Sequence, residues 1–322
     1  MLKTVVTSKQ ESRVKPTYVT GKARVFDPNP VVKLQNENLK DHNDADSAGP
    51  MSGYTTVNLN HLDGSHSLVG KWVRVTNSNL ASSPDIRYFY LRANDKFEQV
   101  NAYQAVDVEQ SYLQSLGFTD VNAEAQKVKV DAFPDDNSYY SPSTDMISMG
   151  TGGVDDAEDP EVTWHEYGHA IQDDQVPGFG SSEEAGSIGE GFGDFMAVMM
   201  SQQTGPHTSL TPTTCVMDWD ATSYTSGPKH CLRTTNTHKM YPGDLTGEVH
   251  ADGEIWSNAL WSMDRRLGRD KATKIIIEAQ FSYNPTITMP AAARVTVSTA
   301  KRLYGAQAAA QTHASFAARG IL

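Results

Sequence analysis

The stretch Trp164-His165-Glu166-Tyr167-Gly168-His169 decides how the rest of the chain is interpreted. Residues four apart lie on one face of a helix, so His165 and His169 would direct two imidazoles at one point. Two imidazoles in this arrangement are typical zinc ligands. Glu166 lies beside them, where it can take a proton from a metal-bound water. A chance match is the alternative, so the motif needs further ligands.

The residues around this motif favour a helix. Asp159 suits an N-cap, and Pro160 suits the first helical position, which needs no backbone N–H. Glu161 places negative charge in the first turn, where the helix dipole favours it. We therefore predict a helix over about residues 160–174, ending before Pro177-Gly178.

A third metal ligand is expected downstream of His169. A metzincin would have Gly and His where this chain has Gln172 and Gln175, so that class is rejected. Glu190 lies in the next predicted helix, as the glutamate of a thermolysin-type site does. Asp194, one turn further on the same face, could accept the outer N–H of a zinc-bound histidine. A solvated acidic face is the alternative, but the apolar residues around it predict a buried helix.

These segments together resemble the thermolysin-type zinc metallopeptidases, the gluzincins. The run Glu190-Gly191-Phe192-Gly193-Asp194-Phe195 is most similar to the fungalysin branch. Three further segments resemble that group in its order along the chain, and the resemblance covers about residues 132–261. These segments are Asn137-Ser138-Tyr139-Tyr140, Cys231-Leu232-Arg233 and Glu248-Val249-His250.

The resemblance implies roles for these segments. Asn137, Ser138 and Tyr139 would lie on an edge strand that binds substrate backbone. Arg233 would bind a substrate carbonyl, with an ordinary surface cation as the alternative. His250 would stabilise the developing oxyanion, with a helix-cap or core histidine as the alternative.

Two details of the implied site stay open. Either Asp244 or Glu248 could orient His250, and the spacing does not decide between them. Thermolysin also has a tyrosine donor between its zinc helix and its glutamate helix. This chain has no Tyr between His169 and Glu190, so the metal, Arg233 and His250 would stabilise the oxyanion without one.

The resemblance implies an α+β, thermolysin-like, two-lobed fold. We expect a β-rich lobe over residues 1–159 and a mainly helical lobe over residues 160–322, with the zinc helix between them. Residues 1–50 are polar and are expected to be irregular. Alternating residues predict strands from residue 54 to residue 91, and residues 139–149 predict a hairpin. Helices are predicted over residues 100–116, 251–267, 271–281, 290–303 and 308–318.

The composition excludes several classes of partner. A net charge of −12 over 322 residues disfavours nucleic acid and anionic membrane surfaces, which need a basic face. No apolar run reaches the length of about 18 residues that a membrane-spanning helix needs. The first residues, Met1-Leu2-Lys3-Thr4-Val5-Val6, lack the apolar core of a signal peptide. If the resemblance holds, a signal peptide and a propeptide would precede this chain.

The chain has two cysteines, Cys215 and Cys231. A disulfide between them would stabilise the fold by about 3 kcal/mol in the chain-entropy model, and it would indicate an oxidising compartment. Two unrelated buried thiols are the alternative. Zinc ligation by cysteine is not expected, because the two histidines and Glu190 already supply three ligands.

Acidic residues are concentrated around the predicted zinc helix. Hard oxygen ligands suit Ca²⁺, and the relatives use Ca²⁺ structurally. A solvated acidic surface with an N-cap is the alternative. The residues concerned are Asp155, Asp156, Glu158, Asp159, Glu161, Asp173, Asp174, Glu183 and Glu184.

The sequence therefore favours a secreted zinc endopeptidase that acts on proteins or peptides, and we expect a monomer. His165, His169 and Glu190 would hold one Zn²⁺, and Glu166 would act as the general base. Two alternatives stay open. One is a zinc-containing binding or structural module without turnover, and the other is an aminopeptidase of the same superfamily.

Overall fold

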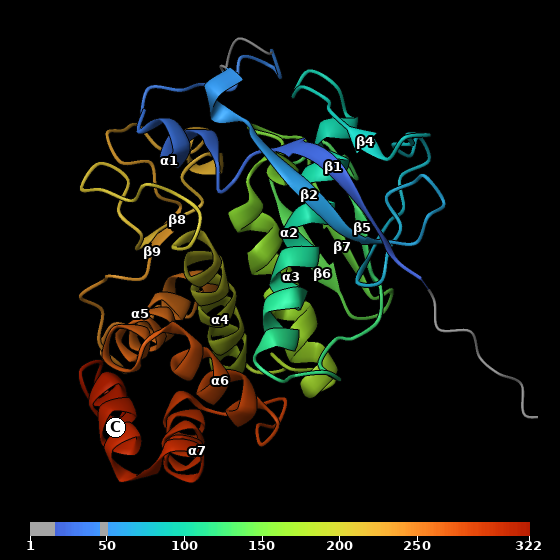
Figure 1. Cartoon of the computed structure of the whole chain (residues 1–322). Helices are drawn as coiled ribbons and strands as arrows, with labels where there is room; N and C mark the ends of the chain where they lie inside the picture. Colours follow the sequence, from blue (N-terminus) through green and yellow to red (C-terminus); the bar gives the residue numbers. More distant parts are fainter. Residues whose placement is uncertain (1–16, 46–50) are drawn as a thin grey trace, which may run out of the picture.

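The structure is a computed structural model that describes residues 17–45 and 51–322 (Figure 1). The six N-terminal residues considered above for a signal peptide lie outside the described part. No helix in the described ranges is both long and apolar enough to cross a membrane. The strands are β1 (Val19–Val25), β2 (Thr55–Leu62), β3 (Val73–Val75), β4 (Arg87–Tyr88), β5 (Gln126–Lys129), β6 (Ser138–Ser141), β7 (Met146–Met149), β8 (Cys215–Val216) and β9 (Arg233–Thr234).

The helices are concentrated after residue 159. Short 3₁₀ segments separate several of them, and α2 is the long helix of the first half. The α-helices are α1 (Pro30–Leu34), α2 (Lys96–Ser115), α3 (Pro160–Gln175), α4 (Glu183–Ser201), α5 (Val249–Leu267), α6 (Arg269–Gln280) and α7 (Met289–Ala317). The 3₁₀ segments are η2 (Met51–Gly53), η3 (Asp156–Glu158) and η4 (Asp220–Thr222).

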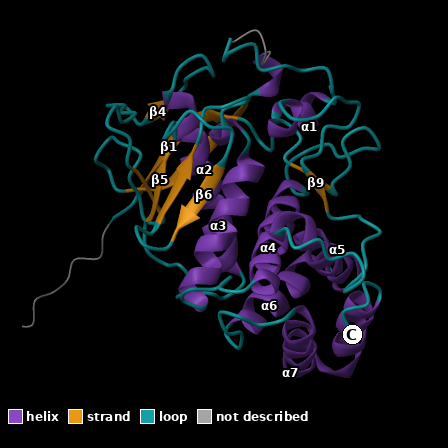
Figure 2. Cartoon of the chain, turned by 180° about the vertical axis from the view of Figure 1, so that it is seen from behind, coloured by secondary structure: helices purple, strands orange, loops and turns teal. Residues whose placement is uncertain are grey.

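The two larger sheets lie beside α2 and α3, whereas α4 to α7 gather on the other side of α3, and the short β8-β9 sheet contacts α4 and α5 (Figures 1 and 2). One sheet has the order β2-β1-β4, and another has the order β3-β5-β7-β6. In the second sheet β3, β5 and β7 are parallel, and β6 is antiparallel to β7. The mixed arrangement confirms the α+β fold class. One hydrophobic core runs through strands and helices alike, and the division at residue 159 stays an interpretation.

The predicted hairpin is present and forms one margin of the second sheet. Ser138 pairs with Met149 and Ser141 with Met146, so β6 and β7 are in a regular antiparallel register. Among the described strands β6 pairs only with β7, which leaves its other edge without a strand partner. Helix α3 packs beside β6 and brings that edge close to the pentad.

Helix α3 is held by the contacts that its sequence predicts. Asp159 caps the helix, since its carboxylate accepts the N–H of Glu161 at 3.1 Å. On one face, Trp164 Nε1–H donates to the carbonyl of Ala105 at 3.1 Å, and the Tyr167 hydroxyl donates to Gln110 at 2.9 Å. These bonds fix α3 against α2, and the opposite face of α3 packs against α4.

Glycines allow α4 to approach its neighbours closely. A Cβ on Gly193 would lie 2.7 Å from Nδ1 of His165, and a Cβ on Gly168 would lie 3.2 Å from Cα of Gly193. On the other side of α4, a Cβ on Gly191 would lie 2.4 Å from the carbonyl oxygen of Gly253 in α5. The glycines of the run 190–195 are therefore required by packing, since α3 and α5 both lie against this turn of α4.

The expectation that residues 1–50 are irregular was wrong for two segments. Strand β1 alternates buried and exposed residues, with Ala23 and Val25 fully buried, and pairs along β2. Helix α1 begins after Asn29, whose side chain accepts the N–H of Val32 at 3.0 Å. The polar composition hid both elements, because long-range pairing and a cap stabilise them more than local propensity does.

The Gly191–Gly253 crossing yields a stability prediction. Gly191→Ala would gain up to about 1 kcal/mol of helix propensity, but its Cβ would collide with backbone. We expect the steric overpacking to outweigh the gain in helix propensity, so the free energy of unfolding should fall by about 1–3 kcal/mol. Urea denaturation measures this quantity. Gly243→Ala is the control and should be neutral, because no atom lies within 4 Å of the added Cβ. Equal stability of both variants would contradict this account of the crossing.

Candidate metal centre and active-site cleft

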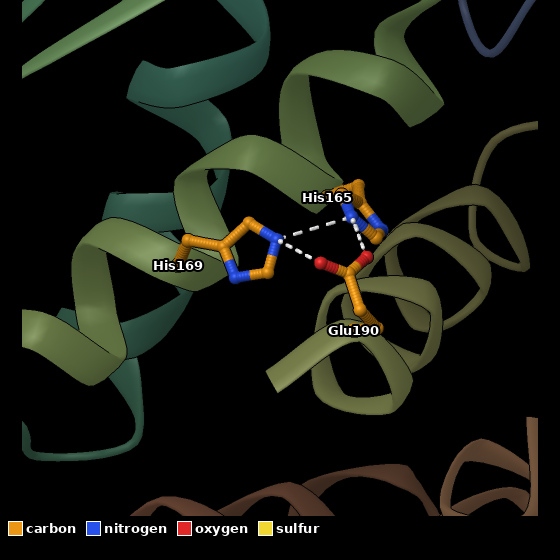
Figure 3. Close-up of side chains that lie close together, drawn as sticks. All are labelled: His165, His169 and Glu190. Atoms are coloured by element: carbon orange, nitrogen blue, oxygen red, sulfur yellow. Dashed lines mark hydrogen bonds and ion pairs between the residues drawn. The ribbon is translucent and has the colours of Figure 1, made fainter. Parts of the chain in front are cut away.

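Three side chains from α3 and α4 converge on one point (Figure 3). Nε2 of His165 lies 3.2 Å from Nε2 of His169 and 3.2 Å from Oε2 of Glu190. Nε2 of His169 lies 3.6 Å from Oε1 of Glu190. The helical spacing of the two histidines and the close packing of the two helices thus bring together the three predicted ligands.

These distances suit a zinc ion. Two ligand atoms about 2.0–2.1 Å from a tetrahedral zinc are about 3.3 Å apart, which is close to the three separations observed. Two imidazoles and one carboxylate are also the donor set of a catalytic zinc site, which keeps its fourth position for water or substrate. The residues therefore fit Zn²⁺ in both chemistry and geometry.

Asp194 sets the orientation of His165. Oδ1 of Asp194 lies 2.9 Å from Nδ1 of His165, and both groups are buried. Burial raises the pKa of Asp194, but Arg233 and His165 outweigh burial and hold this pKa below its usual range. Asp194 is therefore an ionised acceptor, so Nδ1 of His165 carries a proton and Nε2 keeps its lone pair for a metal ion.

The charges at the site favour a cation. Burial raises the pKa of Glu190, but His169, His165 and His250 outweigh it and lower this pKa far below the usual range. Burial lowers the pKa of His165, whereas Asp194 and Glu190 raise it to about 10. The negative charges that hold a proton on the His165 imidazole also favour a divalent metal ion, so the proton and the metal ion compete for the ring.

The three ligands open into a cleft of about 420 Å³. Glu166 lines this cleft beside His165 and His169, and only 6% of its surface is exposed. A carboxylate so placed is available as a base to a water bound between the ligands and the substrate. The remaining lining comes from β6, the end of α3, the loop before α4, and α4 and α5: Asn137, Ser138, Tyr139, Tyr140, Pro142, Gln172, Asp173, Phe179, Gly180, Gly186, Gly189 and His250.

His250 lies at the start of α5 and faces the metal ligands. Its Nε2 lies 3.4 Å from Oε2 of Glu190, and its Nδ1 lies 2.6 Å from Oε1 of Glu248. The alternative orienting acid, Asp244, instead accepts the N–H of Met240. Glu248 also caps α5, since it accepts the backbone N–H groups of His250 and Ala251. The geometry thus selects Glu248, a choice that the spacing alone left open.

Asn137, Ser138 and Tyr139 line the cleft at the edge of β6. The Tyr139 ring is exposed on one side and stacks on Phe133 with centroids 5.5 Å apart. The Ser138 hydroxyl donates to Asp156 at 2.5 Å. The predicted edge therefore lies next to the candidate metal centre, with its backbone available for pairing.

Arg233 lies in β9 behind the metal ligands. Its Nε and Nη2 donate to the two carboxylate oxygens of Asp194 at 2.8 and 2.7 Å. It does not line the cleft described above, and its binding to a substrate carbonyl stays a prediction. Sequence reasoning missed the pairing with Asp194, because 39 residues separate the two side chains.

The predicted disulfide is confirmed. Cys215 and Cys231 are bonded, with their Cα atoms 5.1 Å apart, and the alternative of two unrelated thiols is excluded. Cys215 begins β8, which pairs with β9, and Cys231 lies two residues before Arg233. The bridge therefore fastens the short sheet that carries the partner of Asp194.

The acidic residues around α3 do not form the single cluster that the sequence indicated. Most are satisfied separately by protein donors. Asp159 accepts the N–H groups of Trp219 and Asp220, and Glu158 forms an ion pair with Arg92. Four further carboxylates each accept one backbone N–H group: Glu161 that of Met217, Asp173 that of Gly178, Asp174 that of Asn122, and Glu184 that of Met289. Asp156 alone of them belongs to a group of converging carboxylates outside the zinc site that lacks a cationic partner, together with Asp136 and Asp220. These contacts do not support a single calcium-binding cluster around α3, and calcium binding stays a prediction.

Curated proteins similar to this chain are named as extracellular metalloproteinases. Extracellular metalloproteinase 1 of Phaeosphaeria nodorum is 28% identical in an alignment of 141 residues that covers 40% of this chain and 22% of that protein. Extracellular metalloproteinase 4 of Arthroderma benhamiae is 28% identical in an alignment of 136 residues that covers 35% of this chain and 19% of that protein. The matched region thus spans about a fifth of the length of these relatives.

A solved structure supports the fold. The precursor of protealysin, a metalloproteinase from Serratia proteamaculans, aligns with a TM-score of 0.58 over 77% of this chain and 85% of that chain, at 14% identity. This similarity confirms the expected thermolysin-like architecture. The sequence profile of the fungalysin metallopeptidases (M36) matches residues 150–321, a region that contains the pentad, Glu190, Arg233 and His250. The chain therefore belongs to the fungalysin family of metallopeptidases.

Proposed function

We propose that this metallopeptidase is a zinc-dependent endopeptidase that hydrolyses internal peptide bonds of proteins. The observation that carries the proposal is the convergence of His165, His169 and Glu190 within 3.6 Å, with Glu166 facing the same cleft. Zinc held by these three residues would polarise the substrate carbonyl and acidify a water molecule.

Glu166 is the proposed general base. It accepts a proton from the attacking water and then delivers this proton to the leaving amine. Glu166 follows His165 in sequence and lines the same cleft as both histidines. The proton would therefore travel only a short distance from the water to Glu166 and from Glu166 to the leaving amine. Its position on a buried helix keeps the carboxylate in place between the two transfers.

His250 is the proposed donor to the oxyanion. Nδ1 of His250 is bonded to Glu248, so Nε2 is the ring nitrogen that faces the cleft, where it would donate to the substrate oxygen. That bond strengthens as negative charge develops on the carbonyl oxygen, so it stabilises the transition state more than the substrate. Arg233 contributes to carbonyl binding in this proposal and also holds Asp194 ionised.

Strand β6 is the proposed substrate-binding edge, through Asn137, Ser138 and Tyr139. An extended peptide would pair with its free edge and lay a scissile bond across the metal ligands. Secretion is supported by the disulfide and by the extracellular names of the relatives. A propeptide is supported by the similarity to a protealysin precursor, and a monomer stays our expectation.

Glu166→Gln tests the proposed base. Glutamine keeps the size of the side chain but cannot take up the proton, so we expect zinc content to stay at one per chain and turnover to fall by at least about 10³-fold. Hydrolysis of casein and zinc content should be measured on the same samples. N-terminal sequencing of the products should show cleavage within chains, because an aminopeptidase would release single terminal residues.

The matched control is Glu183→Gln, an exposed glutamate at the start of α4 that does not line the cleft. It should retain both zinc and activity. Zinc in the unmodified protein without activity on any protein substrate would favour the binding-module alternative. Normal turnover by Glu166→Gln would contradict the proposed role of Glu166 as the general base.

Asp194→Asn tests how the ligand His165 is oriented. Asparagine removes the negative charge that fixes the imidazole tautomer and leaves Arg233 without its partner, so zinc affinity should fall by about 10–100-fold. Competition with a chelator measures this affinity without reference to activity. Asp173→Asn is the control, because it removes a carboxylate from the cleft wall without touching a ligand, and its affinity should be unchanged.

His250→Ala tests the proposed oxyanion donor. Loss of one such donor costs about 10²–10³-fold in kcat, and we expect KM and zinc content to change little. Steady-state kinetics on a quenched peptide provide both constants. A decrease confined to KM would instead assign His250 to ground-state substrate binding.

A further inference from the structure

The two proposed histidine ligands differ in what their second ring nitrogen contacts. Nδ1 of His165 lies 2.9 Å from the carboxylate of Asp194. His169 also faces the metal ligands through Nε2, and its Nδ1 is turned away from them (Figure 3). Within residues 17–45 and 51–322, no protein group forms a hydrogen bond with this Nδ1. One of the two imidazoles therefore lacks an orienting acceptor.

A metal-bound imidazole needs an acceptor at its second nitrogen. Ligation through Nε2 uses the lone pair of that atom, so the ring proton must lie on Nδ1. An acceptor for this N–H fixes the tautomer and the ring orientation, and it makes Nε2 a better ligand. The His169 side chain is 24% exposed, so water is one candidate acceptor. A side chain that is already in place would orient the ring without immobilising a water molecule.

Gln172 is a buried amide without a partner on the same helix. It follows His169 by three residues, so the two side chains are neighbours on the surface of α3. Only 3% of Gln172 is exposed, and neither Oε1 nor Nε2 has a hydrogen-bond partner in the described structure. A buried amide in this condition costs free energy until it gains a partner.

Gly189 in α4 leaves a space that both groups face. A Cβ at this position would lie 3.4 Å from Oε1 of Gln172 and 3.7 Å from Nδ1 of His169. The free acceptor and the free ring nitrogen thus lie within 4 Å of one point, where α4 carries no side chain. Because the amide has no hydrogen bond to break, it can turn across this space towards Nδ1.

The neighbouring carboxylate is already engaged. Oδ1 of Asp173 accepts the N–H of Gly178 at 2.9 Å, and its Oδ2 accepts the Tyr140 hydroxyl at 3.3 Å. Gln172, in contrast, has both its donor and its acceptor unused. Of these two consecutive polar residues on α3, Gln172 is therefore the one suited to His169.

We propose that Gln172 is the positioning residue of His169, and that its Oε1 accepts the Nδ1–H of this imidazole when the site holds zinc. Asp194 and Gln172 would then orient the two histidine ligands from two different helices, one with a charged acceptor and the other with a neutral one. The hydrogen bond would add to zinc affinity, because it holds Nε2 of His169 in the form that binds a metal. This inference rests on the proposed zinc centre.

Zinc affinity of two substitutions at residue 172 tests the proposal. Glu166→Gln protein is the background, because it excludes self-digestion, and competition with a chelator measures the affinity. Gln172→Met keeps the length of the side chain but removes the acceptor, so zinc affinity should fall by about 10–100-fold. Gln172→Glu keeps an acceptor oxygen and should bind zinc at least as tightly as the background. A role in packing alone predicts the reverse order, since methionine suits a buried site better than a carboxylate does.

Gln175→Met is the matched control, because it makes the same substitution three residues further along α3. The Gln175 amide donates to the carbonyl of Ile277 at 2.9 Å, and this residue does not line the cleft. Zinc affinity should therefore equal that of the background. Thermal melting without zinc checks folding, and Gln172→Met should melt no lower than the background, because it removes two buried atoms that lack partners.

The ring proton provides a direct readout. In zinc-loaded protein with ¹⁵N-labelled histidine, the Nδ1–H of His169 should exchange slowly with water. Gln172→Met should speed this exchange by roughly tenfold, because the hydrogen bond is lost. The Nδ1–H of His165 is the internal reference, since Asp194 should keep it protected in every variant.

The outcomes separate this inference from the proposed function. Equal zinc affinity of Gln172→Met and the background, or a loss that Gln172→Glu does not restore, would overturn the role of Gln172. Absence of zinc from the unmodified protein would overturn both the metal centre and this role. If zinc binding follows the expected order but the unmodified protein hydrolyses no protein substrate, the proposed peptidase function fails and the role of Gln172 stands.

Discussion

The buried carboxylate of Asp194 is the interaction on which the candidate site depends. It accepts from Nδ1 of His165 on one side and from the guanidinium of Arg233 on the other. A carboxylate without solvent would take up a proton unless cationic donors held it ionised, and a protonated Asp194 could no longer fix the imidazole. The short β8–β9 sheet and its disulfide therefore act on the metal centre from outside the cleft, because they position Arg233.

The glycines of α4 are the second constraint. Asp194 can reach His165 only if α3 and α4 pack nearly backbone to backbone, and Gly193 removes the Cβ that would collide with the imidazole. Gly191, on the opposite side, brings α5 against the same turn and places His250 over Glu190. The metal ligand Glu190 and the orienting acid Asp194 thus share one segment of six residues with the two glycines that let α3 and α5 approach it.

Local patterns in the sequence predicted the parts of the site that local geometry determines. The pentad, its N-cap and the spacing of Glu190 and Asp194 follow helical periodicity, so their positions relative to the helix were predictable. Arg233 and Glu248 were less so, because their partners depend on how β9 and α5 fold back over α4. Strand β1 was missed for the same reason, since its partner β2 lies farther along the chain. Helix α1 was missed because the cap at Asn29 begins a short helix within a segment of polar composition.

The buried acids follow one rule that composition cannot reveal. A carboxylate that loses water must gain backbone N–H donors, a basic side chain, a proton or a metal ion. Asp159 has backbone donors, Glu158 has Arg92, and Asp194 has Arg233. Oδ1 of Asp220 is buried without a hydrogen-bond partner in the described structure, and burial raises the pKa of this carboxyl well above its usual range, which favours the protonated form.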